Sequence, residues 1–359
     1  RRPPRSTPKP SSAASDVYKR QDIDKPTAKI NEALIKITST SICQTDIEEW
    51  QHGPLWVQTE NPNPLSGKKA PLVLGHEISG VIDVINDSIH EDLVGQRVVI
   101  NNILTCEKCY WCESGHHAVC PSMAVAGLSA DGGLQEYMTW PINNLICVPD
   151  NINSDEISLL EPTTVAIHAV RKSNIKPGDT AAVVGCGTVG LLVVQTLNTM
   201  GVNVIAIDLK EKNLILAKEF GARYIVQSSK NSDQIYKKIE EISKIGPDFV
   251  FETAGAEKTP EISINIARRG GTIVLVGIYS HKPKFDFNQI VGLEKNVIGS
   301  VAASKHDMEY AVDLVSKGRI ILKPLVSENI LLSNVIEQGF NKMLSSNKDI
   351  FRIVVKPNK

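Results

Sequence analysis

The sequence predicts an α/β protein with two domains, a β-rich one and one built on a doubly wound parallel sheet. Its 359 residues exceed the size of one ordinary hydrophobic core. Short strand-like segments fill residues 22–160, whereas strands and helices alternate from about residue 178. With 42% hydrophobic and 22% charged residues, the composition is that of a globular protein.

The β-rich domain is predicted over residues 22–160. Its segments alternate between apolar and polar residues or run apolar, with Gly, Pro and Asn between them. The clearest predicted strands are residues 33–42, 78–85 and 92–100. We expect the chain to return to this domain at residues 300–359, which end in the apolar run "FRIVV".

The second domain is predicted over residues 161–299. Apolar strands alternate there with helix-length segments, in the order strand 180–185, helix 188–200, strand 202–208, helix 210–222, strand 248–255, helix 259–270 and strand 271–277. Strands that are apolar throughout are typical of a parallel sheet covered by helices on both faces.

Residues 1–21 do not resemble the rest of the chain. They have no apolar periodicity, and "SSAASDVYKRQ" resembles the translation of a DNA-sequencing adapter, so we interpret them as a non-native or disordered leader. We expect the native start to be missing, which would leave an unpaired strand edge near residues 28–40. The leader has six basic residues and one acidic residue, and without it the formal net charge changes from −1 to −6. That acidic balance argues against a nucleic-acid partner.

Composition also argues against a membrane protein or a secreted one. The longest apolar stretch, residues 181–197, is interrupted by glycines and is short for a membrane span. No basic start leads into an apolar run, as an export signal would. Seven cysteines, four of them within residues 105–120, are unlike a secreted disulfide framework. We therefore expect a cytoplasmic protein with no membrane partner.

The turn after the first strand of the second domain has the pattern G-x-G-x-x-G. Its residues are Gly185, Gly187, Thr188, Val189 and Gly190. They lie between a predicted strand and a predicted helix, where such a turn binds the pyrophosphate of a dinucleotide at the helix N-terminus. Asp208 closes the next strand, where a carboxylate accepts both ribose hydroxyls of the adenosine and repels a 2′-phosphate. The pattern therefore predicts NAD in preference to NADP.

Four cysteines lie close together in one loop, within residues 101–121. They are Cys106, Cys109, Cys112 and Cys120, with the spacing C-x2-C-x2-C-x7-C. Thiolates at this spacing can close a tetrahedral zinc site, which would hold the loop and leave no position for substrate. An iron–sulfur cluster is the alternative, because a proline follows the last cysteine, although the bacterial ferredoxin pattern has only three residues before it. A disulfide pair is disfavoured in a reducing compartment, and His116 and His117 are interpreted as surface residues.

A second set of possible metal ligands is spread along the chain. Cys43, His76 and Glu161 offer one sulfur, one nitrogen and one oxygen. Each signal is weak alone, since a single cysteine is usually a core residue. Together they leave a fourth position open, as a catalytic zinc requires.

The order of these motifs resembles the zinc-dependent medium-chain alcohol dehydrogenases. The segments ICQTD, GHE, the four cysteines, DGGLQEY, EP and GxGxxG follow one another as in that family. Residues 52–77 resemble the 2,3-butanediol and sorbitol dehydrogenase branch in particular. The resemblance implies a GroES-like catalytic domain joined to a Rossmann domain that binds NAD.

The resemblance also implies a role for each site residue. The ligands of the catalytic zinc would be Cys43, His76, Glu161 and, in some states, Glu77. Asp46 would orient His76, and Thr45 would take the proton of the substrate hydroxyl. Many relatives end the proton path with a His five residues after the ligand Cys. That position is Glu48 here, with His52 as a second possibility, and both are equally compatible with a solvated surface.

These observations predict an NAD-dependent dehydrogenase of a secondary alcohol, diol or polyol. We expect two zinc ions per chain, one catalytic and one structural, a small-molecule alcohol substrate, and a homodimer or homotetramer. Glu161 stands where relatives that act on simple primary alcohols have a Cys, which favours diols. A threonine or sugar dehydrogenase of the same family is one alternative, and a non-catalytic binding protein on the same fold is another.

Overall fold

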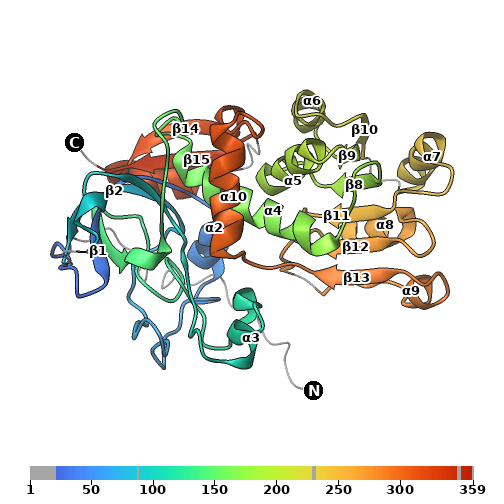
Figure 1. Ribbon diagram of the computed structural model, residues 1–359. Helices are drawn as coiled ribbons and strands as arrows, with labels where there is room; N and C mark the ends of the chain where they lie inside the picture. The colour runs from blue at the N-terminus through green and yellow to red at the C-terminus, as the bar shows by residue number, and fades with distance from the viewer. Residues whose placement is uncertain (1–21, 87–88, 229–231, 281, 346–348, 358–359) are drawn as a thin grey trace, which may run out of the picture. The chain divides into compact units, whose positions relative to one another are not determined.

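The computed structural model describes residues 22–86, 89–228, 232–280, 282–345 and 349–357. The predicted leader, residues 1–21, lies outside the described residues. The chain divides into two compact units, Arg1–Ser158 with Val326–Lys359, and Leu159–Leu325 (Figure 1). Each described helix is too short or too polar to cross a lipid bilayer.

The first unit is built on a mixed sheet of seven strands. Their order is β14 (Val326–Leu331), β15 (Arg352–Lys356), β1 (Glu32–Ser41), β2 (Glu77–Ile85), β3 (Arg97–Ile100) and β7 (Leu145–Cys147), with β6 (Tyr137–Pro141) also paired to β1. All neighbours are antiparallel except β14 and β15. A separate pair joins β4 (Ile103–Leu104) to β5 (Ala124–Val125).

The strand β1 has partners along both of its edges. One edge pairs with β2 from Ala33 to Ser41, and the other pairs with β6 over Glu32–Lys36 and with β15 at Thr40 and Ser41. The expectation of an unpaired strand edge near residues 28–40 was therefore wrong, because two strands from later in the chain cover that edge.

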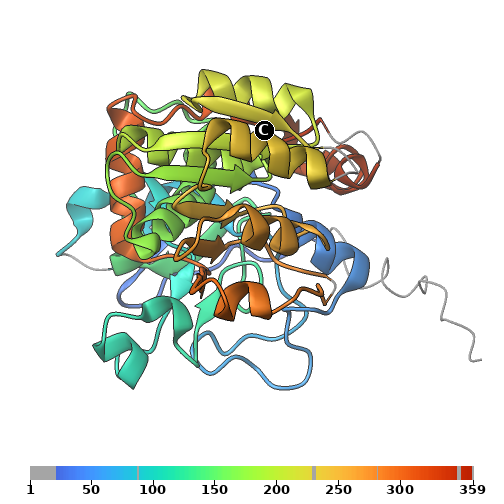
Figure 2. The same cartoon turned by 90° about the vertical axis from the view of Figure 1, so that its right-hand side faces the viewer.

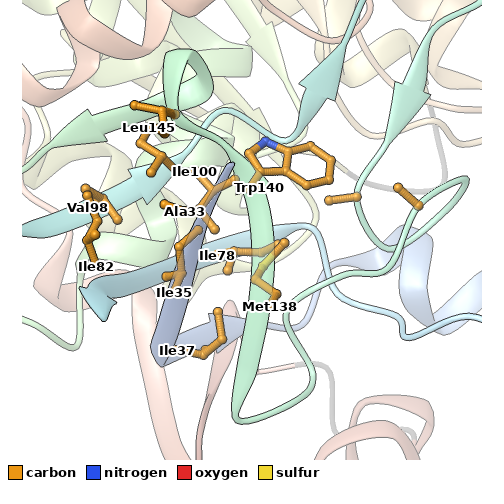
Figure 3. Close-up of a cluster of buried hydrophobic side chains, with 13 residues drawn as sticks. Ala33, Ile35, Ile37, Ile78, Ile82, Val98, Ile100, Met138, Trp140 and Leu145 are labelled. Carbon is orange, nitrogen blue, oxygen red and sulfur yellow. The ribbon is translucent and has the colours of Figure 1, made fainter. Parts of the chain in front are cut away.

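Branched side chains on alternate positions of these strands make the main core of the first unit (Figure 3). Ile35, Ile78 and Ile100 come from three neighbouring strands and are fully buried. Trp140 closes the core, and its indole N–H donates to the carbonyl of Asn101 at 2.9 Å, which satisfies its one polar group. The alternation of the sequence thus fixes which face of each strand is buried.

Short helices complete the first unit. They are α2 (Gln44–His52), α3 (Tyr110–Glu113), α11 (Asn341–Leu344), the 3-10 turns η1 (Glu91–Leu93), η2 (His117–Val119), η3 (Ile142–Asn144) and η6 (Leu332–Asn334), and the π-helix η7 (Val335–Phe340). Two more 3-10 turns lie where the chain passes from one unit to the other: η4 (Ile157–Leu159) spans the first boundary, and η5 (Lys323–Leu325) ends the second unit. The helix α2 packs through Trp50, whose ring stacks on Phe340 at 5.1 Å between centroids.

The second unit is a parallel sheet of six strands (Figures 1 and 2). Their order is β10 (Tyr224–Gln227), β9 (Asn203–Asp208), β8 (Thr180–Val184), β11 (Phe249–Glu252), β12 (Thr272–Leu275) and β13 (Asn296–Gly299). The direction of travel reverses between β8 and β11, so the sheet is doubly wound with its switch point there.

Helices cover both faces of this sheet, which confirms the predicted fold class. They are α4 (Leu160–Ser173), α5 (Thr188–Thr199), α6 (Glu211–Glu219), α7 (Ser232–Ile242), α8 (Thr259–Ile266), α9 (Asn288–Val291) and α10 (Lys305–Ser316). The helices α5 and α6 pack on one face, with α4 against α5. On the other face, Ile235 and Ile239 of α7 and Ile262 of α8 pack on the buried side chains of β8, β9 and β11.

The helix α10 belongs with the second unit, although the sequence placed residues 300–359 in the first domain. Asp307, which is buried, contacts His168 Nδ1 of α4 at 3.0 Å and also accepts a hydrogen bond from Arg171. Burial raises the pKa of Asp307, but hydrogen bonds from His168 and from Ser304 outweigh that effect and bring it below its usual range. These polar contacts tie α10 to α4, and the second unit accordingly extends to Leu325.

Candidate functional site

The four-cysteine loop gathers its sulfur atoms in one place. Cys106, Cys109, Cys112 and Cys120 have ligand atoms that all lie within 4.8 Å of one another. The Sγ atoms of Cys109 and Cys112 are 3.5 Å apart, and the Cys106–Cys112 and Cys109–Cys120 distances are 3.9 and 4.0 Å. A metal–sulfur bond of about 2.3 Å in a tetrahedral site puts neighbouring sulfurs about 3.8 Å apart. The spacing therefore fits a single ion held by four thiolates.

Local backbone structure produces this arrangement. Cys109 precedes the first turn of α3, Cys112 lies within that turn, and Cys120 follows η2. Glu107 has a φ of 55°, a left-handed conformation that turns the chain back toward the later cysteines. All four thiols are free, and their separations far exceed a disulfide bond of about 2 Å, which excludes the disulfide alternative.

Two of the four thiols have pKa values shifted in opposite directions. A backbone hydrogen bond from Lys108 lowers the pKa of Cys106 to about 7. Burial raises the pKa of Cys112 to about 12, and the neighbouring thiols add to that rise. Four thiolates at this spacing repel one another strongly, so the group is stable as thiolates only around a cation. His117 is not a member of this group of possible metal ligands. Its Nε2 atom lies 3.2 Å from the carbonyl oxygen of Cys112.

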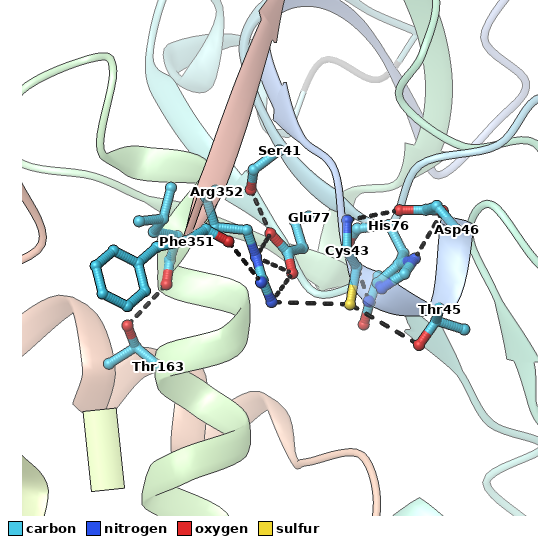
Figure 4. Close-up of polar contacts among 11 residues, drawn as sticks. Ser41, Cys43, Thr45, Asp46, His76, Glu77, Thr163, Phe351 and Arg352 are labelled. Atoms are coloured by element: carbon cyan, nitrogen blue, oxygen red, sulfur yellow. Dashed lines mark hydrogen bonds and ion pairs between the residues drawn. The ribbon is translucent and has the colours of Figure 1, made fainter. Parts of the chain in front are cut away.

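A second group joins Cys43, His76 and Glu77, whose ligand atoms also lie within 4.8 Å of one another (Figure 4). Strand pairing produces this group. The antiparallel ladder of β1 and β2 pairs Ser41 with Glu77. Cys43 follows β1 as the N-cap residue of α2, and His76 directly precedes β2. Residues that are far apart in the sequence are thus placed side by side by one register.

Asp46 holds both Cys43 and His76. Its Oδ2 atom accepts the backbone N–H of Cys43 at 2.9 Å, and its Oδ1 atom lies 3.3 Å from His76 Nδ1. The second contact is close enough for charge attraction but is off hydrogen-bond geometry. Burial lowers the pKa of His76, but the nearby Asp46 and Cys43 outweigh that effect and raise it well above 6.5. The predicted orienting role of Asp46 agrees with this placement.

Glu77 is buried and is engaged by a residue that the sequence did not single out. Arg352 of β15 donates from Nε to both carboxylate oxygens, at 3.0 and 2.9 Å, and its Nη2 atom lies 2.9 Å from Oε1. Ser41 also donates to this carboxylate. The same Nη2 atom is 3.8 Å from Cys43 Sγ, so the guanidinium lies against the metal-ligand group (Figure 4). A basic residue inside the apolar run "FRIVV" was the available signal.

The helix α2 carries the three residues proposed for the proton path. Thr45 is half-buried, with its hydroxyl oxygen 3.8 Å from Cys43 Sγ. Glu48 is half-buried and His52 is exposed at the last residue of the helix. Their spacing of three and four residues puts them along one side of α2. Glu49, between them, was missed: it is buried and accepts the backbone N–H groups of Leu55 and Trp56.

The glycine turn of the second unit has the shape that a dinucleotide turn needs. Gly185 has a φ of +97°, and a Cβ atom there would lie 2.7 Å from the Cβ of Ala254. A Cβ atom on Gly190 would lie 1.9 Å from the carbonyl oxygen of Gly185, so helix α5 meets the turn without room for a side chain. Gly187 is exposed and has open space where a Cβ would be. Room at the helix N-terminus is what an approaching phosphate requires.

Asp208 ends β9 beside this turn. Its Oδ2 atom accepts the backbone N–H of Cys186 at 2.6 Å, and its Oδ1 atom accepts that of Lys210 at 2.8 Å and the side-chain amide of Asn213 at 3.3 Å. The carboxylate is therefore oriented by neutral donors, at the strand end where the sequence predicted it.

Glu161 is the second residue of α4 and belongs to the second unit, whereas Cys43 and His76 belong to the first. Its place as the third protein ligand stays a prediction.

Comparisons with known proteins match both units of the chain. Residues 29–150 match the family described as the alcohol dehydrogenase GroES-like domain, and residues 188–317 match the zinc-binding dehydrogenases. The chain is 30% identical to (R,R)-butanediol dehydrogenase of Neisseria gonorrhoeae, over 94% of this chain and 96% of that protein. It is 30% identical to D-xylulose reductase A of Aspergillus oryzae, over 95% of each.

A solved structure shows the same fold. The crystal structure of 2R,3R-butanediol dehydrogenase from Bacillus subtilis superimposes with a TM-score of 0.86 at 31% identity, covering 94% of this chain and 96% of that one. The chain therefore belongs to the zinc-dependent medium-chain alcohol dehydrogenase family, near its butanediol and sorbitol dehydrogenase branch, and is a dehydrogenase.

Proposed function

We propose that this dehydrogenase oxidises a vicinal diol or polyol at a catalytic zinc, with NAD as hydride acceptor. The observation that carries the proposal is the pairing of Cys43 and His76 at the start of α2, with Asp46 buried behind them. One thiolate and one imidazole are ligands that zinc prefers. Relatives that cover 94% and 95% of this chain are named for a diol and for a keto sugar, (R,R)-butanediol dehydrogenase and D-xylulose reductase A.

The catalytic zinc would be held by Cys43, His76 and Glu161. When bound there, it supplies a Lewis acid for the oxygen of an alcohol. Asp46 keeps His76 in place through the contact at Nδ1, which leaves Nε2 for the metal. Thr45, whose hydroxyl lies beside Cys43 Sγ, would accept the proton of the substrate hydroxyl while it releases its own hydroxyl proton. The group at the end of this path would be Glu48 or, in its place, His52.

The four-cysteine group would hold a structural zinc. Its closed set of four sulfurs leaves no position for substrate, so the ion fixes the loop. The single-ion spacing of the sulfurs favours zinc over an iron–sulfur cluster, in which the cysteines are spread over several iron atoms.

Replacing one ligand tests this assignment. Cys109→Ser should lower the thermal unfolding midpoint by roughly 5–10 °C and remove one zinc, while the other zinc stays bound in the folded protein. Cys147→Ser, at an exposed cysteine outside both groups, is the matched control and should change neither quantity. Full thermal stability of Cys109→Ser, or earlier loss of the catalytic zinc, would contradict the structural role.

The choice of NAD rests on Asp208. Its carboxylate is fixed at the end of β9 next to the glycine turn, where it can accept the ribose hydroxyls and repel a 2′-phosphate.

Asp208→Ala should raise the KM for NAD about tenfold, because a charge-assisted hydrogen bond is lost. It should also reduce the difference in KM between NAD and NADP. Since Asp208 also braces the turn, Asp208→Asn is measured beside it. The Asn variant keeps one acceptor but lacks the charge, so it should relax the preference against NADP with a smaller rise in KM. A wild-type enzyme that prefers NADP would refute the assignment.

Glu161 supports a diol or polyol substrate. A carboxylate is a harder ligand than a thiolate and donates less charge to zinc, so the ion keeps more Lewis acidity. A carboxylate that leaves the metal also frees space for a second substrate hydroxyl.

We expect kcat/KM for 2,3-butanediol to exceed that for ethanol at least tenfold. Glu161→Cys should retain its zinc and lose diol turnover disproportionately. Steady-state assays at the NADH absorbance band give the ratio. A ratio of kcat/KM for 2,3-butanediol to that for ethanol near or below one, in a fully zinc-loaded enzyme, would contradict the proposed preference for diols.

We also propose that the protein assembles as a homodimer or homotetramer. The strand β13 is an edge of the second unit's sheet, and Phe287, Val291 and Val297 on or beside it are exposed. An exposed apolar edge strand is prone to pair with another chain. Light scattering should give a multiple of the 39.2 kDa chain mass, and Val297→Lys should reduce it. A monomer at micromolar concentration would contradict the proposal.

A further inference from the structure

Glu252 is a buried carboxylate that has no cationic partner in the part of the chain that the structure describes. It is the last residue of β11 and is 0% exposed. Its Oε1 atom accepts the backbone N–H groups of Ala254 and Gly255 at 3.0 and 2.9 Å, and the hydroxyl of Thr259 lies 2.7 Å away. Tyr279 donates its phenol to Oε2. Among the described residues, no Lys, Arg or His forms an ion pair with it.

The groups around Glu252 are those that an ionised carboxylate takes. Backbone amides can only donate, and both point at Oε1. Burial raises the pKa of Tyr279, and the Glu252 carboxylate raises it further, so the phenol keeps its proton and donates. A buried charge that is stabilised by neutral donors alone is costly unless a positive charge comes to it.

The position of Glu252 in the sheet indicates the source of such a positive charge. Glu252 pairs in register with Val184 of β8, at the strand ends where the direction of the sheet reverses. Dinucleotides bind across the crevice at this switch point. The adenosine half goes to the side of β9, where Asp208 lies, so the nicotinamide half lies over the ends of β11 and β12.

Close packing holds the carboxylate at this edge. Thr253 donates its hydroxyl to the carbonyl of Gly185 at 2.6 Å, which ties the loop after β11 to the glycine turn. On the other side, a Cβ atom on Gly277 would lie 2.4 Å from the nitrogen of Gly255 and 2.7 Å from Oε2 of Glu252. The loops after β8, β11 and β12 are therefore joined around one fixed negative charge.

We propose that Glu252 is a specificity-determining residue whose charge favours the oxidised coenzyme over the reduced one. This inference rests on the proposed use of NAD. The nicotinamide ring carries a positive charge in NAD+ and none in NADH, while the rest of the molecule is the same. A buried, unscreened carboxylate near the ring therefore attracts NAD+ and discriminates against NADH.

The test compares the dissociation constants of NAD+ and NADH for the wild-type zinc-loaded protein and for Glu252→Gln, measured by calorimetric titration. The Gln variant keeps the size of the side chain and loses the charge. The Kd for NAD+ should rise about three- to tenfold more than the Kd for NADH, because the variant loses a charge–charge attraction that only NAD+ has. Glu261→Gln, at an exposed carboxylate on α8, is the matched control and should leave the ratio unchanged.

Tyr279→Phe separates charge from positioning. It removes a hydrogen bond to Glu252 but keeps the carboxylate, so it should change both dissociation constants by the same factor. If Gln at position 252 prevents folding, Glu252→Asn is the second neutral variant and must give the same change in the ratio. Equal changes for NAD+ and NADH in the neutral variants would overturn the inference. A wild-type protein that binds neither NAD+ nor NADH would instead refute the proposed coenzyme.

Discussion

The ladder between β1 and β2 is the constraint on which the group of Cys43, His76 and Glu77 depends. Its register pairs Ser41 with Glu77, which brings the end of one strand and the start of the other together. Cys43 lies two residues after the end of β1, and His76 lies one residue before the start of β2. A slip of one residue would turn Glu77 to the opposite face of the sheet and separate the ligands. The buried branched residues on the core face resist such a slip, so hydrophobic packing fixes the chemistry.

Three buried carboxylates show three ways of stabilising a negative charge. Glu77 has a guanidinium from β15, Asp46 has an imidazole and a backbone N–H, and Glu252 has only neutral donors. The first two have partners within the protein, a guanidinium for Glu77 and the ring nitrogen of His76 for Asp46, and both lie beside the proposed metal site. The third leaves an uncompensated charge at the switch point of a dinucleotide sheet, which makes it the one that responds to a ligand's charge.

Local patterns in the sequence predicted much of this structure. The glycine turn, Asp208 and the four cysteines are continuous motifs, and each lies in the predicted context because short segments determine it. Contacts between distant segments were harder to foresee. Arg352 reaches Glu77 only because β15 pairs with β1, and nothing in the sequence states that pairing. The same pairing covers the strand edge that was expected to be open, and the contact of Asp307 with α4 extends the second unit to Leu325.

We propose two metal sites of different chemistry in this chain, a closed one of four thiolates and an open one at Cys43 and His76. Metal analysis of the purified protein tests it most directly. We expect about two zinc ions per chain in the wild-type protein and about one in Cys43→Ser, with the remaining ion resistant to a mild chelator. One zinc or none in the wild-type protein, or the loss of both ions in a folded Cys43→Ser variant, would contradict it.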